Sequence, residues 1–339
     1  MKIAMIAGVT GQDGAYLSKF LLLKGYNIIG VLRKNKKSNL KNLEYLGVSN
    51  KIKFIKMDLL DLPFIIKILE NNNIDEIYNF AAQSSVGLSF NTPIETINFN
   101  IISTANLLEA IRIVNPKIKY YQASSSEMFG NVEKQNLPIN ETTAFHPISP
   151  YGTSKAASHW ITVNYREIYN IFAVCGICFN HESVLRGYNF VTKKITDTAV
   201  KISMGFANEI KLGNLKIFRD WGYAPNYIEA MWLMLQQDTP EDYVISSGEA
   251  HSLEEFAKKV FKKLKLDIEK FIRIDRNLYR PTDLEINYGD NSKAKNKLKW
   301  NYNMNFEQLI NRLVDDELKY FDWKIKHNNK SINDLKILK

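Results

Sequence analysis

The sequence predicts an α/β protein built on a doubly wound parallel sheet, with a smaller α/β lobe in the C-terminal half. Two observations lead to this prediction. Short apolar runs that suit buried strands alternate with segments of helical periodicity through the first half of the chain. The first apolar run, residues 2–7, ends in a glycine-rich turn that leads into a helical segment, residues 15–24. A strand, turn and helix in this order are the start of a βαβ unit.

The composition is that of a globular protein. The chain has 339 residues, of which 45% are hydrophobic and 24% charged, so it can bury a large core in one domain or two joined domains. No apolar run reaches the roughly 18 residues of a membrane span, and the first run stops at Gly8, too early for a signal-peptide core. We therefore expect a cytoplasmic protein with no membrane partner. The net charge of +9 comes from scattered lysines, so we also expect no nucleic-acid partner.

The glycine-rich turn is typical of a dinucleotide site. Glycines at this position let the backbone approach a pyrophosphate, which then lies against the N-terminus of the following helix. A second strand, residues 27–32, follows at the spacing that such a unit requires. We interpret the turn as a cofactor site rather than as a plain turn, with Gly8, Thr10, Gly11, Gln12, Asp13 and Gly14 as its candidate residues.

The end of the second strand indicates which dinucleotide binds. An acidic residue there would hold a ribose 2′-hydroxyl, but the chain has Arg33 and Lys34. Cations at this position suit a 2′-phosphate, so the sequence favours NADP over NAD. The alternative is that both residues only begin the basic loop 34–41.

The next two strands end in further candidates. Strand 52–57 is followed by helix 63–71, and strand 76–80 by a long helix, residues 96–113. Because the carboxyl ends of parallel strands meet at one edge, the residues after them are expected near the cofactor. Asp58 could accept a hydrogen bond from the adenine amino group, the alternative being a cap for the next turn. The candidates here are Asp58, Leu59, Ala81, Ala82 and Gln83.

A hydroxyl, a carboxylate and a phenol are expected to converge near the fifth strand. Strand 119–123 runs into Ser125 and Glu127, and a helix beyond it carries Tyr151 and Lys155 four residues apart, on one face. We expect the ammonium of Lys155 to lower the pKa of Tyr151. Such a set can do acid and base chemistry at adjacent carbons of a sugar.

The second half of the chain is less regular. Cys175 and Cys178 lie in a buried strand, residues 171–179, where residues three apart face opposite sides, so we interpret them as buried thiols and expect no metal. Arg219 and Arg280 follow on loops and suit a second diphosphate, the alternative being surface ion pairs. His181, after this strand, is either a ligand contact or a structural histidine.

The ordered motifs of the chain resemble those of the GDP-mannose 4,6-dehydratase family, which belongs to the extended short-chain dehydrogenase/reductases. The resemblance covers residues 3 to about 318 and is most specific in the Gln-Asp pair of the glycine turn. The motifs that carry it are Gly8-x-x-Gly11-Gln12-Asp13-Gly14-x-Tyr16-Leu17, Tyr121-Gln122-Ala123-Ser124-x-Ser126-Glu127, Ser149-Pro150-Tyr151-Gly152-x-x-Lys155, Phe179-Asn180-His181-Glu182-Ser183, Gly213-Asn214-Leu215, Arg219-Asp220-Trp221-Gly222 and Tyr279-Arg280-Pro281-Thr282.

The resemblance implies a tightly held NADP, a GDP-sugar substrate and a homodimer or homotetramer. It makes Ser125, Glu127, Tyr151 and Lys155 catalytic, adds His181 and Arg186 to the cofactor site, and assigns Ser85, Asn180, Glu182, Lys194, Arg219 and Arg280 to the substrate. It implies an NADP-binding domain over residues 1–180 with a returning segment near 222–248, a GDP-sugar lobe over 181–221 and 249–323, and a basic tail over 324–339, which we expect to be frayed.

The implied reaction is dehydration of a GDP-manno-configured sugar to its 4-keto-6-deoxy product. The chain departs from the family pattern at Ser125, where Thr is usual, at Val184-Leu185, where Pro-Arg is usual, and at Asn226, where an acid is usual. These departures leave GDP-D-mannose and GDP-D-glycero-D-manno-heptose as alternative substrates. Two other functions compete: a nucleotide-sugar 4-epimerase, which needs no carboxylate at C5, and a non-catalytic NADP sensor, which would not need to keep Tyr151, Lys155 and Glu127.

Overall fold

The computed structural model describes residues 1–34 and 38–327. Within these residues, seven parallel strands form the central sheet in the order β11-β6-β5-β4-β1-β2-β3. This arrangement confirms the predicted doubly wound parallel sheet. The strand order reverses between β1 and β4, and ligands of such sheets bind outside the carboxyl ends at this point. The strands are β1 (Ile3–Ala7), β2 (Asn27–Arg33), β3 (Lys53–Met57), β4 (Glu76–Asn79), β5 (Lys119–Ser125), β6 (Ala173–Cys178) and β11 (Tyr243–Ile245).

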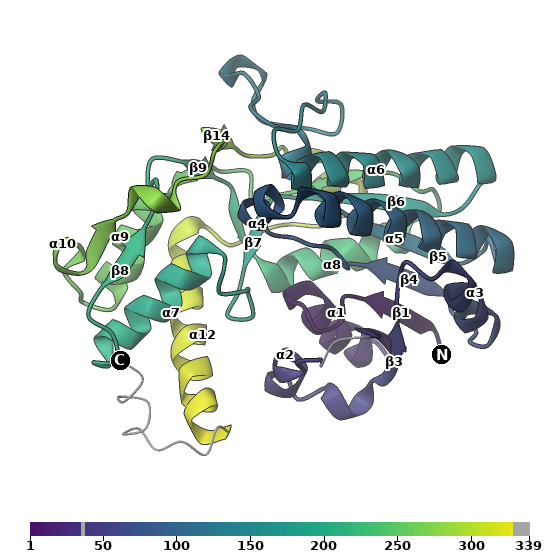
Figure 1. Cartoon of the computed structure of the whole chain (residues 1–339), viewed down its shortest axis with the longest axis horizontal. Helices are drawn as coiled ribbons and strands as arrows, with labels where there is room; N and C mark the ends of the chain where they lie inside the picture. The colour runs from purple at the N-terminus through teal and green to yellow at the C-terminus, as the bar shows by residue number, and fades with distance from the viewer. Residues whose placement is uncertain (35–37, 328–339) are drawn as a thin grey trace.

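Helices cover both faces of the sheet (Figure 1). α1 (Gln12–Leu23) packs beside α8 (Ala224–Leu235) on one face, and α3 (Leu62–Glu70), α5 (Pro93–Val114) and α6 (Pro150–Tyr169) lie on the other. The interior strands β1 and β6 are apolar and almost wholly buried, as parallel strands between two helical layers must be, whereas edge strand β3 exposes two lysines. Two shorter helices, α2 (Lys41–Tyr45) and α4 (Val86–Asn91), lie near the carboxyl edge, and the sequence pattern did not predict them.

The C-terminal lobe lies beside this edge (Figure 1). β7 (Asn180–Glu182) leaves the sheet and pairs with β10 (Trp221–Tyr223), and the lobe packs α7 (Val191–Ser203), α9 (Leu253–Lys263) and α12 (Phe306–His327) around an apolar core. Its smaller elements are β8 (Ile210–Leu212), β9 (Phe218–Arg219), β12 (His251–Ser252), α10 (Ile268–Phe271), β13 (Ile272–Ile274) and β14 (Ile286–Asn287). α11 (Ser292–Lys297) packs instead against β11 of the central sheet. No described helix is both long and apolar enough to cross a membrane.

The expected start of a frayed tail at residue 324 is wrong. α12 continues to His327, and Lys324 forms an ion pair with Asp197 of α7, with Nζ 3.2 Å from Oδ1. A charge partner on a neighbouring helix could not be inferred from the polar composition of this segment. The rest of the expected tail, residues 328–339, lies outside the described residues.

α6 begins in close contact with the end of β5. Ser149 caps the helix by accepting a hydrogen bond from the Gly152 amide at 3.0 Å. A Cβ on Gly152 would lie 2.6 Å from the Glu127 carbonyl oxygen, so only glycine permits this approach. One helical turn later, Lys155 Nζ donates to the Ala123 carbonyl at 2.7 Å. The two contacts fix how far α6 lies from β5.

We predict that Gly152→Ala destabilises the fold by about 1–3 kcal/mol, the usual cost of overpacking, because the added methyl group would meet backbone. Gly87→Ala in α4 is the matched control, since its Cβ would meet nothing within 4 Å. Urea unfolding of both variants measures the difference, and equal free energies of unfolding would contradict the packing argument.

Candidate active site

Two adjoining cavities open at the carboxyl edge of the sheet. The first has a volume of about 400 Å³ and extends into the C-terminal lobe; the second has about 620 Å³ and lies beside β2 and β3. Both are lined by Gly8, Gly11 and Ala82, so they are two parts of one cleft. Most of the predicted site residues line it: Gln12, Asp13, Gly14, Ser85, Ser125, Glu127, Tyr151, Lys155, Asn180, His181, Glu182, Arg186, Arg219 and Arg280 in the first cavity, and Thr10, Arg33, Asp58, Leu59 and Ala81 in the second.

The glycine turn is tight enough to exclude side chains. Gly8 has φ +84°, and a Cβ there would lie 2.9 Å from the Phe80 carbonyl carbon. A Cβ on Gly14 would lie 2.4 Å from the Gly8 carbonyl oxygen. Because Gly8 and Gly14 carry no side chains, a ligand can approach the backbone of the turn closely.

The second cavity combines cations with an apolar wall. Arg33 and Lys34 line it together with Phe99, whose ring centroid lies 5.5 Å from the Arg33 guanidinium carbon. Asp58 Oδ1 accepts the Leu60 amide at 3.0 Å, so Asp58 caps the turn after β3 while it also lines the cavity. The two alternatives considered for Asp58 are thus compatible.

Tyr151 and Lys155 meet Ser125 at the end of β5. Burial raises the pKa of Tyr151 to about 12, with the Glu127 charge acting in the same direction and a hydrogen bond to Ser125 acting against it. Burial also lowers the pKa of Lys155 to about 8. The expectation that Lys155 lowers the pKa of Tyr151 is wrong for the protein alone, because Lys155 Nζ is held by the Ala123 carbonyl, 5.9 Å from the centroid of the tyrosine ring.

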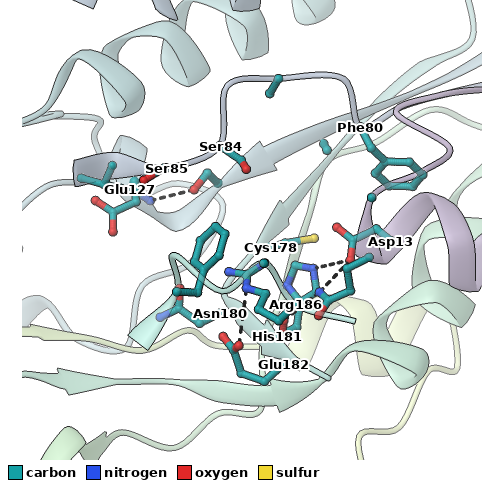
Figure 2. Close-up of a pocket in the computed structure, with 18 of the residues that line it drawn as sticks. Asp13, Phe80, Ser84, Ser85, Glu127, Cys178, Asn180, His181, Glu182 and Arg186 are labelled. Carbon is teal, nitrogen blue, oxygen red and sulfur yellow. Dashed lines mark hydrogen bonds and ion pairs between the residues drawn. The ribbon is translucent and has the colours of Figure 1, made fainter. Parts of the chain in front are cut away.

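Glu127 lies on the opposite wall of the first cavity from the glycine turn (Figure 2). Burial raises its pKa, and the Asp283 charge adds to this effect, while Arg219 and Arg280 oppose it. A carboxyl group whose pKa is shifted toward neutrality can both take up and release a proton. Glu127 is therefore suited to act as base and acid in one reaction.

Two arginines bring positive charge to the same cavity. Arg219 is buried, with Nη2 2.6 Å from Asp283 Oδ1 and Nη1 2.7 Å from the Leu284 carbonyl oxygen. Arg280 Nη1 lies 3.8 Å from the same Oδ1 atom. Arg219 is not a surface ion pair, because it is buried and Asp283 orients its guanidinium group, whereas Arg280 is exposed and makes only the longer contact. Both line the first cavity, where an anion could bind.

A third arginine, Arg186, lines the first cavity. Arg186 Nε is 3.4 Å from Glu182 Oε2 (Figure 2), and its guanidinium carbon lies 3.7 Å above the centroid of the Phe190 ring. Within residues 1–34 and 38–327 this buried Nε atom has no hydrogen-bond partner. Glu182 is also held by Thr192, whose hydroxyl donates to Oε2 at 2.6 Å.

Two predicted residues lie outside both cavities. Gln83 donates to the Ser85 carbonyl at 2.9 Å and to Thr96 Oγ1 at 3.2 Å, so it shapes the loop after β4. Lys194 Nζ donates to the Lys211 carbonyl at 2.6 Å. Each of these side chains hydrogen-bonds a nearby backbone carbonyl. The spacing of residues in the sequence does not reveal such contacts.

The sequence analysis missed several lining residues. Ser84 and Ser124 adjoin predicted residues at strand ends, so the strand-end rule would have found them. Cys178 is a buried free thiol, as expected, yet it also lines the first cavity. Others come from segments without a motif: Asn42, Asn189, Phe190, Thr192, Ile217 and Met231. Within the described residues no group of three or more His, Cys, Asp or Glu side chains is placed to hold a metal ion.

Comparison with known proteins identifies what the chain is similar to. The family model described as GDP-mannose 4,6 dehydratase matches residues 5–313. GDP-mannose 4,6 dehydratase 2 of Arabidopsis thaliana is 45% identical over 327 residues, which cover 94% of this chain and 87% of the relative.

Two solved structures share the fold. Superposition on dTDP-glucose 4,6-dehydratase of Bacillus anthracis in complex with NAD gives a TM-score of 0.83 at 21% identity, covering 95% of this chain and 98% of that one. RMD of Pseudomonas aeruginosa complexed with NADPH gives 0.79 at 19% identity, covering 94% and 100%.

Proposed function

Because the chain belongs to the GDP-mannose 4,6-dehydratase family, we propose that it removes water from a GDP-manno-configured sugar and releases the GDP-4-keto-6-deoxy sugar. The observation that carries this proposal is that Glu127 shares one cavity with Tyr151 and Lys155. Internal dehydration needs a base that removes a hydroxyl proton during hydride transfer, here Tyr151, and a carboxyl that transfers a proton during elimination, here Glu127. The net reaction makes the enzyme a lyase.

The cleft fits a nicotinamide dinucleotide, and we propose NADP. The backbone at Gly8 and Gly14, which carry no side chain, suits a pyrophosphate. Arg186 Nε, which lies 3.4 Å from Glu182 Oε2 but has no hydrogen-bond partner among the described residues, suits an anion beside it. Arg33 and Lys34 in the second cavity suit a 2′-phosphate. When bound, the cofactor accepts a hydride from C4 and returns it to C6, and the positive charge of its oxidised ring favours the ionised form of Tyr151.

Tyr151 starts the proposed reaction by taking the proton of the C4 hydroxyl as the hydride leaves C4. Ser125 hydrogen-bonds Tyr151, and we propose that its hydroxyl also holds the C4 oxygen while the ketone forms. Lys155 lies on the same helix face, and we propose that its ammonium adds to the cofactor's positive charge in favouring the phenolate once substrate and cofactor are bound. The 4-ketone makes the C5 proton acidic.

Glu127 completes the elimination. Its carboxylate takes the C5 proton, and the protonated carboxyl then gives a proton to the C6 hydroxyl, which leaves as water. C5 would then take up a proton from water as the hydride returns to C6, and Tyr151 would release the C4 hydroxyl proton to water, which leaves the 4-keto-6-deoxy sugar and one water molecule lost. We propose that Arg219 and Arg280 hold the GDP diphosphate, with Ser85, Asn180 and Glu182 along the sugar.

The same cavity also suits the alternatives left open by the sequence. GDP-D-glycero-D-manno-heptose differs from GDP-mannose by one hydroxylated carbon beyond C6, and Leu185 lines the first cavity where the family pattern has Arg. A 4-epimerase would use Tyr151 and Lys155 without Glu127. A non-catalytic NADP sensor would use none of the three.

We expect incubation with GDP-mannose to yield a product lighter by one water molecule, measured by mass spectrometry. The same assay with GDP-D-glycero-D-manno-heptose ranks the two substrates by kcat/KM. A product of unchanged mass from both sugars would point to epimerisation, and no turnover of either would contradict the proposed function.

We expect Arg33→Asp to weaken NADP binding by about tenfold or more relative to NAD, because it replaces a cation with an anion where the 2′-phosphate would lie. Arg273→Asp, exposed in the C-terminal lobe, makes the same charge change away from the cleft and controls for net charge. Calorimetric titration with both dinucleotides gives the ratio. An unchanged ratio in Arg33→Asp would contradict NADP selection by this residue.

We expect Glu127→Gln to form the reduced cofactor normally in a single turnover but to release water at least about 10²-fold more slowly, because Gln keeps the hydrogen bonds and loses the base. Tyr151→Phe should block even the first hydride transfer. Reduced-nicotinamide absorbance and solvent deuterium at C5 separate the two steps. Exchange at C5 at the normal rate in Glu127→Gln would mean that another residue is the base.

We further propose a homodimer or homotetramer that pairs α5 and α6 across a two-fold axis. Both helices expose large apolar side chains, among them Ile94, Ile102, Ile113, Trp160, Ile168 and Tyr169, and in a symmetric dimer such faces cover each other. A monomeric mass by light scattering at micromolar concentration would contradict this. The basic loop 34–41 includes residues 35–37, which lie outside the described residues. The cytoplasmic location stays a prediction, which cell fractionation tests.

A further inference from the structure

The glycine turn is bound to β7 by side chains on both sides. Gln12 Nε2 donates to the His181 carbonyl at 3.0 Å, and Ser183 Oγ donates to Gln12 Oε1 at 2.7 Å. Asp13 Oδ1 lies 3.1 Å from His181 Nε2 (Figure 2). These contacts join residues that are about 170 positions apart in the chain, at the boundary between the sheet and the C-terminal lobe.

His181 has an oxygen acceptor at each ring nitrogen. Nδ1 lies 2.7 Å from the Phe179 carbonyl oxygen, which can only accept, and Nε2 faces the Asp13 carboxylate. Both nitrogens must therefore carry a proton, and the ring is an imidazolium. Its face stacks on Tyr227 of α8 at 4.9 Å between ring centroids. Arg186 and Lys155 are other charged groups that interact with the pair.

We propose that Asp13 and His181 are a positioning pair that locks the glycine turn to β7, so that the cofactor half and the sugar half of the cleft keep one geometry. The proposal rests on the proposed function for what each half binds. β7 ends at Glu182, which we propose lies along the sugar, and Arg186 follows four residues later, beside the proposed pyrophosphate site; both line the first cavity. Breaking the lock therefore loosens two binding surfaces with one substitution, although neither side chain of the pair needs to touch a reacting atom.

The charges of the pair reinforce each other. Burial acts against the charged forms of both residues. The charge and hydrogen bond of His181, with smaller effects of Gln12 and Arg186, nevertheless lower the pKa of Asp13 to about 2. Asp13 in turn raises the pKa of His181. The stabilisation from Asp13 is present above its ordinary value of 3.8 and is lost as the pH falls through about 2. The stabilisation from His181 is present below 6.5 and is lost as the pH rises through its raised pKa.

The protonation state can be measured directly. In nitrogen NMR spectra of the histidine-labelled protein, His181 should remain an imidazolium at pH 7. His159 is an internal control, because burial lowers its pKa and a serine hydroxyl lies 3.1 Å from its Nδ1. A neutral His181 ring at pH 7 would overturn the proposal.

The lock is tested by a double-mutant cycle with Asp13→Asn, His181→Gln and the double variant. Each single variant should weaken both NADP and GDP binding by about tenfold, the value of one charged hydrogen bond, and the double variant should be no weaker than either single one. Amide exchange in the ligand-free protein should speed up at residues 11–14 and 180–183 together. His251→Gln removes another histidine that pairs with carboxylates, Glu249 and Glu255, and should leave all these readouts unchanged.

The outcomes separate this inference from the proposed function. If amide exchange speeds up only at the substituted residue, or the losses in affinity add in the double variant, the positioning role is wrong while the dehydratase proposal stands. If the wild-type protein binds NADP and GDP but does not dehydrate a GDP-sugar, the proposed function is wrong and the lock stands.

Discussion

The approach of α6 to the end of β5 is the contact on which the site depends. Gly152 lets the helix backbone lie against the Glu127 carbonyl, and Lys155 reaches back to the Ala123 carbonyl one helical turn later. Tyr151 directly precedes Gly152 on this helix, so its distance from Ser125 is set by packing rather than by a flexible loop. A small shift of this helix would move the Tyr151 phenol away from the Glu127 carboxyl, so that the two groups could no longer act on the same substrate.

Burial shapes the electrostatics of this site. It raises the pKa of Tyr151 and of Glu127 and lowers that of Lys155, so each group is driven toward its neutral form. The charges that would favour the ionised forms are those of a bound cofactor and of the arginines beside a diphosphate. Acid and base strength in this cleft would therefore depend on what is bound, which suits a reaction whose intermediates must not be exposed to water.

Much of the fold followed from the sequence because parallel strands between two helical layers give a strong signal. Apolar runs such as residues 76–80 matched their strands closely, and the glycine turn identified the edge at which ligand-binding residues gather. The site was predictable where a residue follows directly on a strand or repeats at helical spacing, as with Glu127 and the Tyr151–Lys155 pair. Prediction failed where tertiary packing decides, since Lys194 bonds the Lys211 carbonyl, α12 extends to His327, and the pKa of Tyr151 rises rather than falls.

We propose that one cleft oxidises C4, eliminates water across C5 and C6, and reduces C6 without releasing the hydride. The most direct test uses GDP-mannose carrying deuterium at C4, with the product analysed by NMR. We predict that the deuterium is found at C6 of the 4-keto-6-deoxy product, at every turnover and in the presence of unlabelled NADPH. Deuterium that stays at C4, or that is lost to the added cofactor pool, would contradict the account.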